Sequence, residues 1–208
     1  MPVNINSFSN NEIYQRKQYQ KRGIGRWYWN YRDRQILSFI KNKQSIIDLG
    51  CGEGITLEKL IKKFPDKDIR GIDYCRENIE ICKKHRLPVE HGSVYDLKIK
   101  DNSINCIVFL EVIEHLDDPQ RALSEIYRVL KKNGLLLLIF PNDKIFRIAR
   151  ILIFKFKEAF YDPGHTKQWT PKKIKKVLKK LDFKIIKINN MPFFFWSLSL
   201  HCLVVVRK

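Results

Sequence analysis

Two glutamates and two histidines are the side chains of this sequence best suited to acid–base or metal chemistry. Glu111, Glu114 and His115 follow an apolar run, and at positions i, i+3 and i+4 of one helical turn they would share a face. His165 lies further along the chain. A carboxylate or an imidazole can act as a general base, and two of each together can bind a divalent cation.

Three interpretations of this group stay open. In the first, His115 or His165 acts as a general base toward a hydroxyl, with Glu111 as a third catalytic candidate. In the second, all four side chains, Glu114 included, bind a divalent metal that lowers the pKa of that hydroxyl; this is possible, but we do not expect it. In the third, Glu111 lines a cofactor pocket, while Glu114 and His115 bond to the local backbone.

A glycine-rich segment, Asp48-Leu49-Gly50-Cys51-Gly52-Glu53-Gly54, joins an apolar run to a helical pattern. Glycines permit a tight turn and a close approach of ligand to backbone, and the N-terminus of the following helix favours an anionic group. Asp73 ends the next apolar run, where a carboxylate can accept hydrogen bonds from ribose hydroxyls. The segment therefore predicts a site for a nucleotide-like cofactor, without choosing between cofactors.

The same segment resembles the first motif, D-x-G-x-G-x-G, of class I S-adenosylmethionine-dependent methyltransferases. The resemblance continues in the family's order to the C-terminus and implies S-adenosylmethionine as the cofactor. Its further elements are Gly71-Ile72-Asp73, His91 to Leu97, Glu111 to Pro119, Arg128 to Gly134, and Pro141-Asn142. The E-x-x-E-H part is similar to both ubiquinone-pathway O-methyltransferases and small-RNA 2′-O-methyltransferases, the latter also having a later histidine.

The resemblance also assigns roles to individual residues. Asp48 and the backbone at Gly50 and Gly52 would hold the methionyl part of the cofactor, and Asp73 would bind the ribose. Tyr74 would pack on the adenine. The remaining members of the expected cofactor site are Cys51, Gly54, Ser93, Val94 and Leu110.

Alternating strand and helix patterns position these residues. Continuous apolar runs of this kind are typical of a parallel sheet that is covered on both faces, so we expect an α/β, Rossmann-like, doubly wound fold. The resemblance further implies that the sheet has seven strands, mostly parallel, with an antiparallel last strand. Strands are predicted at 45–49, 69–72, 89–92, 104–110, 135–140, 183–188 and 200–206, and helices at 57–64, 79–85 and 122–130.

We expect one domain over residues 1–208. It would comprise a leading helical segment (1–44), a cofactor-binding half (45–141), an insertion (142–163) and a substrate-side half (164–208). The insertion mixes apolar and basic residues, which suggests a hydrophobic or membrane-adjacent acceptor such as a lipid, a quinone precursor or a lipid-linked glycan. Phe193 to Trp196 have two interpretations, a lipid-facing lip and core packing beside the last strand, of which we expect the second. We expect His85, His91 and His201 to be structural.

The chain is strongly basic, with 40 Lys and Arg against 22 Asp and Glu and a net charge of +18. This charge favours anionic partners, nucleic acid among them, although many lysines lie on the solvated face of a helical pattern at 172–181. Five scattered cysteines without a C-x-x-C pair argue against a disulfide framework and a zinc cage. With neither a secretory signal nor a membrane span in the sequence, we expect a cytoplasmic address and allow peripheral membrane contact.

Together these features predict an S-adenosylmethionine-dependent methyltransferase that O-methylates a small-molecule, lipid or glycan acceptor. One alternative is an RNA 2′-O-methyltransferase with a divalent metal at the Glu/His group. The other is a non-catalytic cofactor-binding protein. The oligomeric state does not follow from the sequence.

Overall fold

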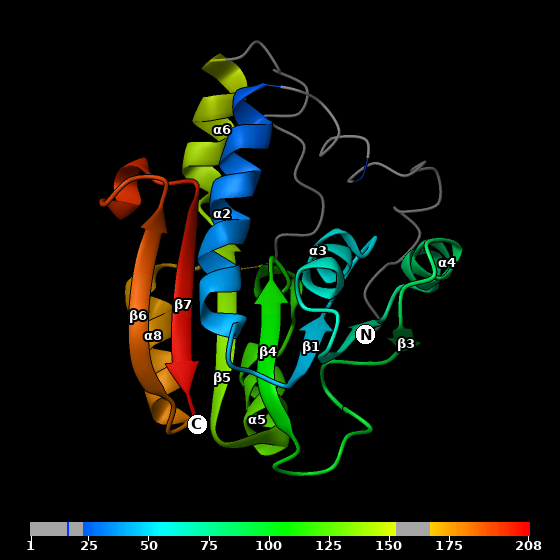
Figure 1. The fold of residues 1–208 in the computed structure, drawn as a ribbon. Helices are drawn as coiled ribbons and strands as arrows, with labels where there is room; N and C mark the ends of the chain where they lie inside the picture. The colour runs from blue at the N-terminus through cyan, green and yellow to red at the C-terminus, as the bar shows by residue number, and fades with distance from the viewer. Residues whose placement is uncertain (1–15, 17–22, 153–166) are drawn as a thin grey trace.

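A seven-stranded sheet forms the centre of the protein, seen here in a computed structural model that describes Arg16, residues 23–152 and residues 167–208. The strand order is β3-β2-β1-β4-β5-β7-β6 (Figure 1). Pairing is parallel from β3 through β5, whereas β7 runs antiparallel to both β5 and β6. The strands are β1 Ser45–Leu49, β2 Asp68–Asp73, β3 Val89–His91, β4 Ile104–Leu110, β5 Leu130–Pro141, β6 Lys184–Met191 and β7 His201–Arg207.

Helices cover both faces of this sheet, as the continuous apolar strands predict. On one face α2 (Ile24–Ile40), α3 (Ile55–Lys63) and α4 (Arg76–Lys84) contribute to one buried apolar cluster. On the other face α5 (Pro119–Val129) and α8 (Pro171–Lys180) contribute to a second. The doubly wound architecture and its antiparallel last strand are therefore confirmed.

The lysine-rich pattern near the C-terminus forms α8, and its polarity follows the prediction. Thr170 caps the helix by accepting a hydrogen bond from the Lys173 N–H at 3.2 Å, and Pro171 occupies the first turn. Ile174 and Leu178 are fully buried. The lysines of α8 therefore lie mainly on its solvated side, and much of the net charge needs no partner to explain it.

The insertion begins as helix α6, Asp143–Leu152, and its remainder, together with His165, lies outside the described residues. In Figure 1, α6 lies at the end of the molecule toward which the parallel strands point, the end at which α2 begins. No helix in the described ranges has both the length and the apolar character that crossing a bilayer requires.

The prediction of core packing for Phe193 to Trp196 is wrong for three of the four residues, and Trp27 is a further exposed aromatic residue. Trp27 is 57% exposed, because the buried stripe of α2 runs through Tyr28, Ile36 and Ile40. Of the Phe193 to Trp196 set, Trp196 packs on Phe140 with 5.5 Å between ring centroids. The three phenylalanines instead project from the loop between β6 and β7 and are exposed. A short apolar run beside a strand does not reveal where the strand ends.

Candidate active site

The glycine-rich segment forms the corner between β1 and α3. Gly50, Gly52 and Gly54 all have positive φ angles, of 71°, 54° and 74°. At Gly50 a Cβ atom would also meet the Val112 side chain at 2.4 Å, so the position excludes any larger residue twice over. The predicted tight turn is present, and it leads directly into the N-terminus of a helix.

Asp73, at the end of β2, faces this corner. Its Oδ2 accepts a 2.7 Å hydrogen bond from the Gly52 N–H, and its Oδ1 accepts from the Cys75 N–H at 2.9 Å and from Asn78 Nδ2 at 3.3 Å. Asp73 is only 8% exposed, so its carboxylate is turned toward the loop and away from bulk solvent. The acid and the glycine corner are thus brought together as the sequence predicts.

Asp48 lies beneath the same corner, on β1. The residue is 2% exposed, and its Oδ2 has no hydrogen-bond partner among the described residues. Burial raises the pKa of this carboxyl to about 7, and the nearby Asp73 charge contributes to that rise, while Arg32 acts in the opposite direction. A buried acceptor without a partner costs free energy, which a cationic or hydrogen-bonding ligand would recover.

The other expected cofactor residues surround this corner at the carboxyl edge of the sheet. Tyr74 is 60% exposed, with its ring 5.7 Å from that of His91. Ser93 is paired with Asp96 in an isolated bridge after β3, and the Asp96 side chain points outward to Lys98. Cys51 is buried, and Val94 and Leu110 are partly buried against the two cores.

Glu111 follows β4 at the same edge and is held by residues that the sequence analysis did not bring together. Its backbone has a φ of 54°, which is unusual for a residue with a side chain. Arg32 Nη1 donates to its Oε1 at 2.6 Å, and His201 Nε2 lies 3.5 Å from the same oxygen. The Tyr28 hydroxyl in turn lies 2.5 Å from His201 Nδ1. Glu111 therefore has a strained backbone, and contacts from α2 and from the start of β7 fix its carboxylate.

The expected convergence of Glu111, Glu114 and His115 on one helical turn does not occur. Only Ile113–His115 form a helix, a single 3-10 turn, so Glu111 precedes it. Glu114 is 2% exposed, whereas His115 is exposed. Within residues 23–152 and 167–208, no three His, Cys, Asp or Glu side chains are grouped so as to hold a metal ion. His165 is not among those residues, so the four-residue metal site is not tested.

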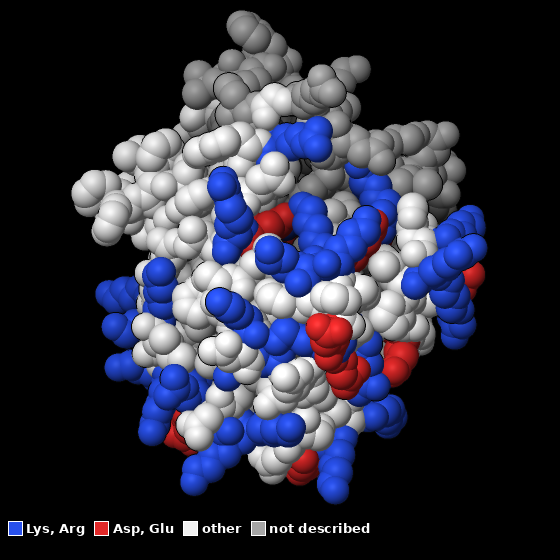
Figure 2. Space-filling model, in the orientation of Figure 1, with Lys and Arg blue, Asp and Glu red and all other residues white. Residues whose placement is uncertain are grey.

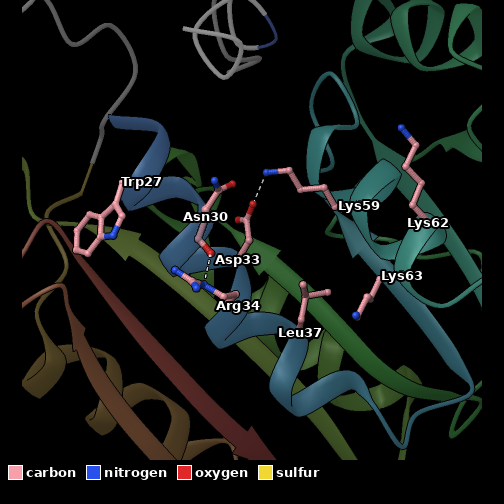
Figure 3. Close-up of a pocket in the computed structure, with 8 residues that line it drawn as sticks. All are labelled: Trp27, Asn30, Asp33, Arg34, Leu37, Lys59, Lys62 and Lys63. Atoms are coloured by element: carbon pink, nitrogen blue, oxygen red, sulfur yellow. Dashed lines mark hydrogen bonds and ion pairs between the residues drawn. The ribbon is translucent and has the colours of Figure 1, made fainter. Parts of the chain in front are cut away.

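An alternating run of charges connects Glu111 to a groove between α2 and α3. Arg32 donates to Asp33 Oδ1 at 3.1 Å from Nη2, and Lys59 on α3 donates to Asp33 Oδ2. Figure 3 shows Lys59 reaching across to Asp33. The groove has a volume of about 550 Å³ and is lined by Trp27, Asn30, Asp33, Arg34, Leu37, Lys59, Lys62 and Lys63.

Known proteins are similar to this chain in sequence. A family described as a methyltransferase domain matches residues 47–138. A probable S-adenosylmethionine-dependent methyltransferase of Mycolicibacterium smegmatis is 26% identical over 76% of this chain and 60% of its own length. The ubiquinone biosynthesis O-methyltransferase of Pelagibacter ubique is 26% identical over 71% of this chain and 65% of its own. These similarities support the class I S-adenosylmethionine-dependent methyltransferase superfamily as the one that this chain resembles, with the family match over residues 47–138.

A solved structure supports the fold. An S-adenosylmethionine-dependent methyltransferase from Archaeoglobus fulgidus superimposes with a TM-score of 0.71 at 19% identity, covering 95% of this chain and all of that one. The chain spans less than two thirds of the length of both curated relatives named above.

The family's cofactor, S-adenosylmethionine, fits the residues at the glycine corner. Asp48 offers a buried oxygen without a partner to the methionyl ammonium, and Asp73 offers a carboxylate for the ribose hydroxyls. The N–H groups of the corner and of the first turn of α3 can receive the methionyl carboxylate. The cofactor supplies an electrophilic methyl group on a sulfonium, and the chain's part is to orient the acceptor and exclude water.

Four residues of this edge were missed by the sequence analysis. Tyr28, Arg32 and His201 form the surroundings of Glu111, and Arg16 donates to the Glu53 carbonyl at 2.9 Å and to Glu58 at 2.8 Å beside the glycine corner. One signal was available for Arg32: it lies four residues after Tyr28 and four before Ile36, on the buried stripe of α2. A basic residue on such a stripe needs a buried partner.

Proposed function

We propose that this protein transfers the methyl group of S-adenosylmethionine to a hydroxyl of a small lipid-like or glycan acceptor, with Glu111 facing that hydroxyl. The observation that carries the proposal is that Glu111 has a strained backbone and a carboxylate that Arg32 fixes at the carboxyl edge of the sheet. Local strain at a ligand-binding edge persists only where surrounding contacts hold it, and such residues cluster at functional sites.

A carboxylate suits this role because methyl transfer to an oxygen benefits from a group that accepts the hydroxyl proton. The Glu111 side chain is 34% exposed, so it can reach a ligand while Oε1 stays bonded to Arg32. His201 is fully buried and acts as a positioning residue. His115 and His165 remain the alternative bases of the proposal.

An apolar acceptor is supported by the surroundings of this edge. The rings of Tyr28, Trp29 and Phe146 lie 5.6, 5.7 and 4.9 Å from that of His201, so the wall beside Glu111 is aromatic. The Pelagibacter relative, named as a ubiquinone biosynthesis O-methyltransferase, offers a precedent for O-methylation in quinone biosynthesis. These observations favour a small apolar hydroxyl compound over RNA.

The test is transfer of a tritiated methyl group into fractions of a cell extract by the full chain. We expect label in the organic-solvent fraction, and none with Gly52→Arg, which blocks the glycine corner. Glu111→Gln should lower the rate at saturating cofactor by about a hundredfold, which is typical for the loss of a general base. Glu90→Gln, at a carboxylate whose side chain is 59% exposed on β3, is the matched control.

Two results would contradict the proposal. The first is label that enters RNA or protein while the organic fraction stays unlabelled. The second is a Glu111→Gln rate equal to that of Glu90→Gln, in which case His115→Ala and His165→Ala identify the base. A thermal shift with S-adenosylmethionine alone shows that each variant still binds cofactor, so that a lost rate reports on the acceptor side.

A further inference from the structure

The loop between β6 and β7 carries the most exposed apolar side chains of the described structure. Phe193, Phe194 and Phe195 are 57%, 95% and 69% exposed, and Leu198 is 56% exposed. The segment Pro192 to Leu200, here called the phenylalanine loop, contains no charged residue. Contiguous exposed apolar groups of this kind mark interaction surfaces in soluble proteins.

The carbonyl groups of this loop are well supplied with internal hydrogen bonds. The Ser199 hydroxyl lies 2.7 Å from the Phe193 carbonyl, and Asn190 Nδ2 donates to the Phe194 carbonyl at 2.9 Å. The Leu198 N–H donates to the Phe195 carbonyl at 3.1 Å, and Asn142 Nδ2 donates to the Trp196 carbonyl at 2.8 Å. Four successive carbonyls thus have partners, although the three phenylalanine side chains among them face outward.

This combination matches the demands of a bilayer better than those of water. In water, exposed carbonyls need no internal donors, and three adjacent exposed phenylalanines are unfavourable. In lipid, each backbone polar group must find its partner within the protein. The donors Ser199 and Asn142 are themselves buried, at 0% and 7% exposure, so the loop keeps these bonds when its apolar tip leaves water.

The base of the loop is rigid. Trp196 packs on Phe140 of β5, and the Leu200 N–H donates to the Met191 carbonyl at 2.8 Å, closing the loop. Because His201 pairs with Pro141 at the end of β5, the loop projects from the carboxyl edge that also holds Glu111. The phenylalanines are therefore presented in a fixed direction beside the candidate active site.

Basic residues and further apolar residues accompany the loop. In Figure 1 the loop and α6 lie at the same end of the sheet, the end at which α2 begins. Lys144 and Arg147 on α6 are exposed, as is Ile148 at 51%, and Trp27 on α2 is 57% exposed. Figure 2 shows the projection formed by the loop as uncharged, with Lys and Arg spread over the neighbouring surface.

We propose that the phenylalanine loop inserts into the interfacial region of an anionic lipid bilayer and places the active-site edge against the membrane. Aromatic and aliphatic side chains supply the apolar contact. The basic residues of α6, on a chain whose net charge is +18, supply attraction to anionic headgroups. The proposal is independent of the acceptor's identity, because vesicle binding is measured without methyl transfer.

Flotation of the full chain with vesicles tests this. We expect binding to vesicles of phosphatidylcholine with phosphatidylglycerol, and weaker binding to phosphatidylcholine alone. Replacing Phe193, Phe194 and Phe195 by serine should lower the partition coefficient at least tenfold, since one buried phenylalanine contributes about tenfold or more. The control is Ile186→Ser, which removes an apolar residue, 44% exposed, from β6 outside the loop, and should leave binding unchanged.

Insertion is separated from surface adsorption by a second measurement. Phe194→Trp should show quenching by brominated lipids in excess of that of the parent chain. Two results overturn the proposal. One is equal vesicle binding by the parent chain and the triple serine variant. The other is vesicle binding that high salt abolishes, together with no excess quenching in the Phe194→Trp variant. The proposal is also overturned if the parent chain does not bind vesicles and the serine substitutions convert it from a dimer to a monomer. The loop would then be a protein interface.

Discussion

Arg32 on α2 donates a 2.6 Å hydrogen bond to Glu111, which lies 79 positions later, at the end of β4. Arg32 is 3% exposed and also bonds Asp33, so it holds two carboxylates. The leading helix is thereby part of the candidate site and does more than cover the sheet.

Arg32→Met should lower the free energy of unfolding by about 2–3 kcal/mol, because the substitution removes the arginine to which two carboxylates are bonded. The loss is smaller than for a fully buried pair, since Glu111 is partly exposed and Asp33 keeps Lys59. Urea unfolding measures the change. Arg34→Met, on the exposed side of the same helix, should change stability by less than about 0.5 kcal/mol. Equal losses in both variants would show that Arg32 has no special role.

Gly50→Ala should destabilise the fold by about 2–4 kcal/mol, because its φ of 71° disfavours a side chain and the new Cβ would meet Val112 at 2.4 Å. Gly25→Ala is the opposite case. That glycine lies in α2 with nothing within 4 Å of a built Cβ, so alanine should stabilise by about 0.5–1 kcal/mol. Thermal unfolding of both variants without ligand measures the difference. A tolerated alanine at position 50 would contradict the observed corner.

Asp48 should make stability depend on pH. Its pKa is about 7 in the folded protein and about 4 when unfolded, so the folded state binds the proton more tightly. The stability contributed by this group is present below about pH 4 and is lost as pH rises toward 7. Asp48→Asn should therefore match the parent at low pH and exceed it by about 2–4 kcal/mol above pH 7, without ligand.

Denaturant unfolding at a series of pH values measures this difference. A difference between the two proteins that stays constant over the series would mean that folding does not shift the pKa of the Asp48 carboxyl. Comparing variant with parent matters here, because other acids, Glu58 and Glu125 among them, have lowered pKa values and contribute the opposite slope.

The sequence predicts that the glycine corner and Asp73 meet, but it does not predict the contacts of Glu111, for a physical reason. The glycine corner and Asp73 belong to neighbouring strand ends, where local pattern and sheet geometry fix their meeting. Glu111 meets Arg32 and His201 through side-chain packing between α2, β4 and β7, and no periodicity records such a contact. The phenylalanines show the same limit, because apolar character alone does not separate a core residue from an exposed loop.

Tyr28 and His201 provide the last test, since His201 lies beside the Glu111 carboxylate and Tyr28 bonds to His201. The Tyr28 hydroxyl lies 2.5 Å from Nδ1 of a histidine that is fully buried. Tyr28→Phe keeps the stacked ring and should cost about 1–3 kcal/mol, because the buried imidazole loses its partner. His201→Leu should cost a similar amount by stranding the hydroxyl.

The double variant should cost less than the sum of the two, since replacing both partners by apolar groups leaves no polar group stranded by the loss of its partner. Urea unfolding of the four proteins gives this coupling directly. Tyr31→Phe, at a half-buried tyrosine stacked on Trp27, is the control and should change stability by less than about 0.5 kcal/mol. Strictly additive losses would mean that the hydroxyl and the imidazole do not share a hydrogen bond, and Glu111 would then be held by Arg32 without help from this pair.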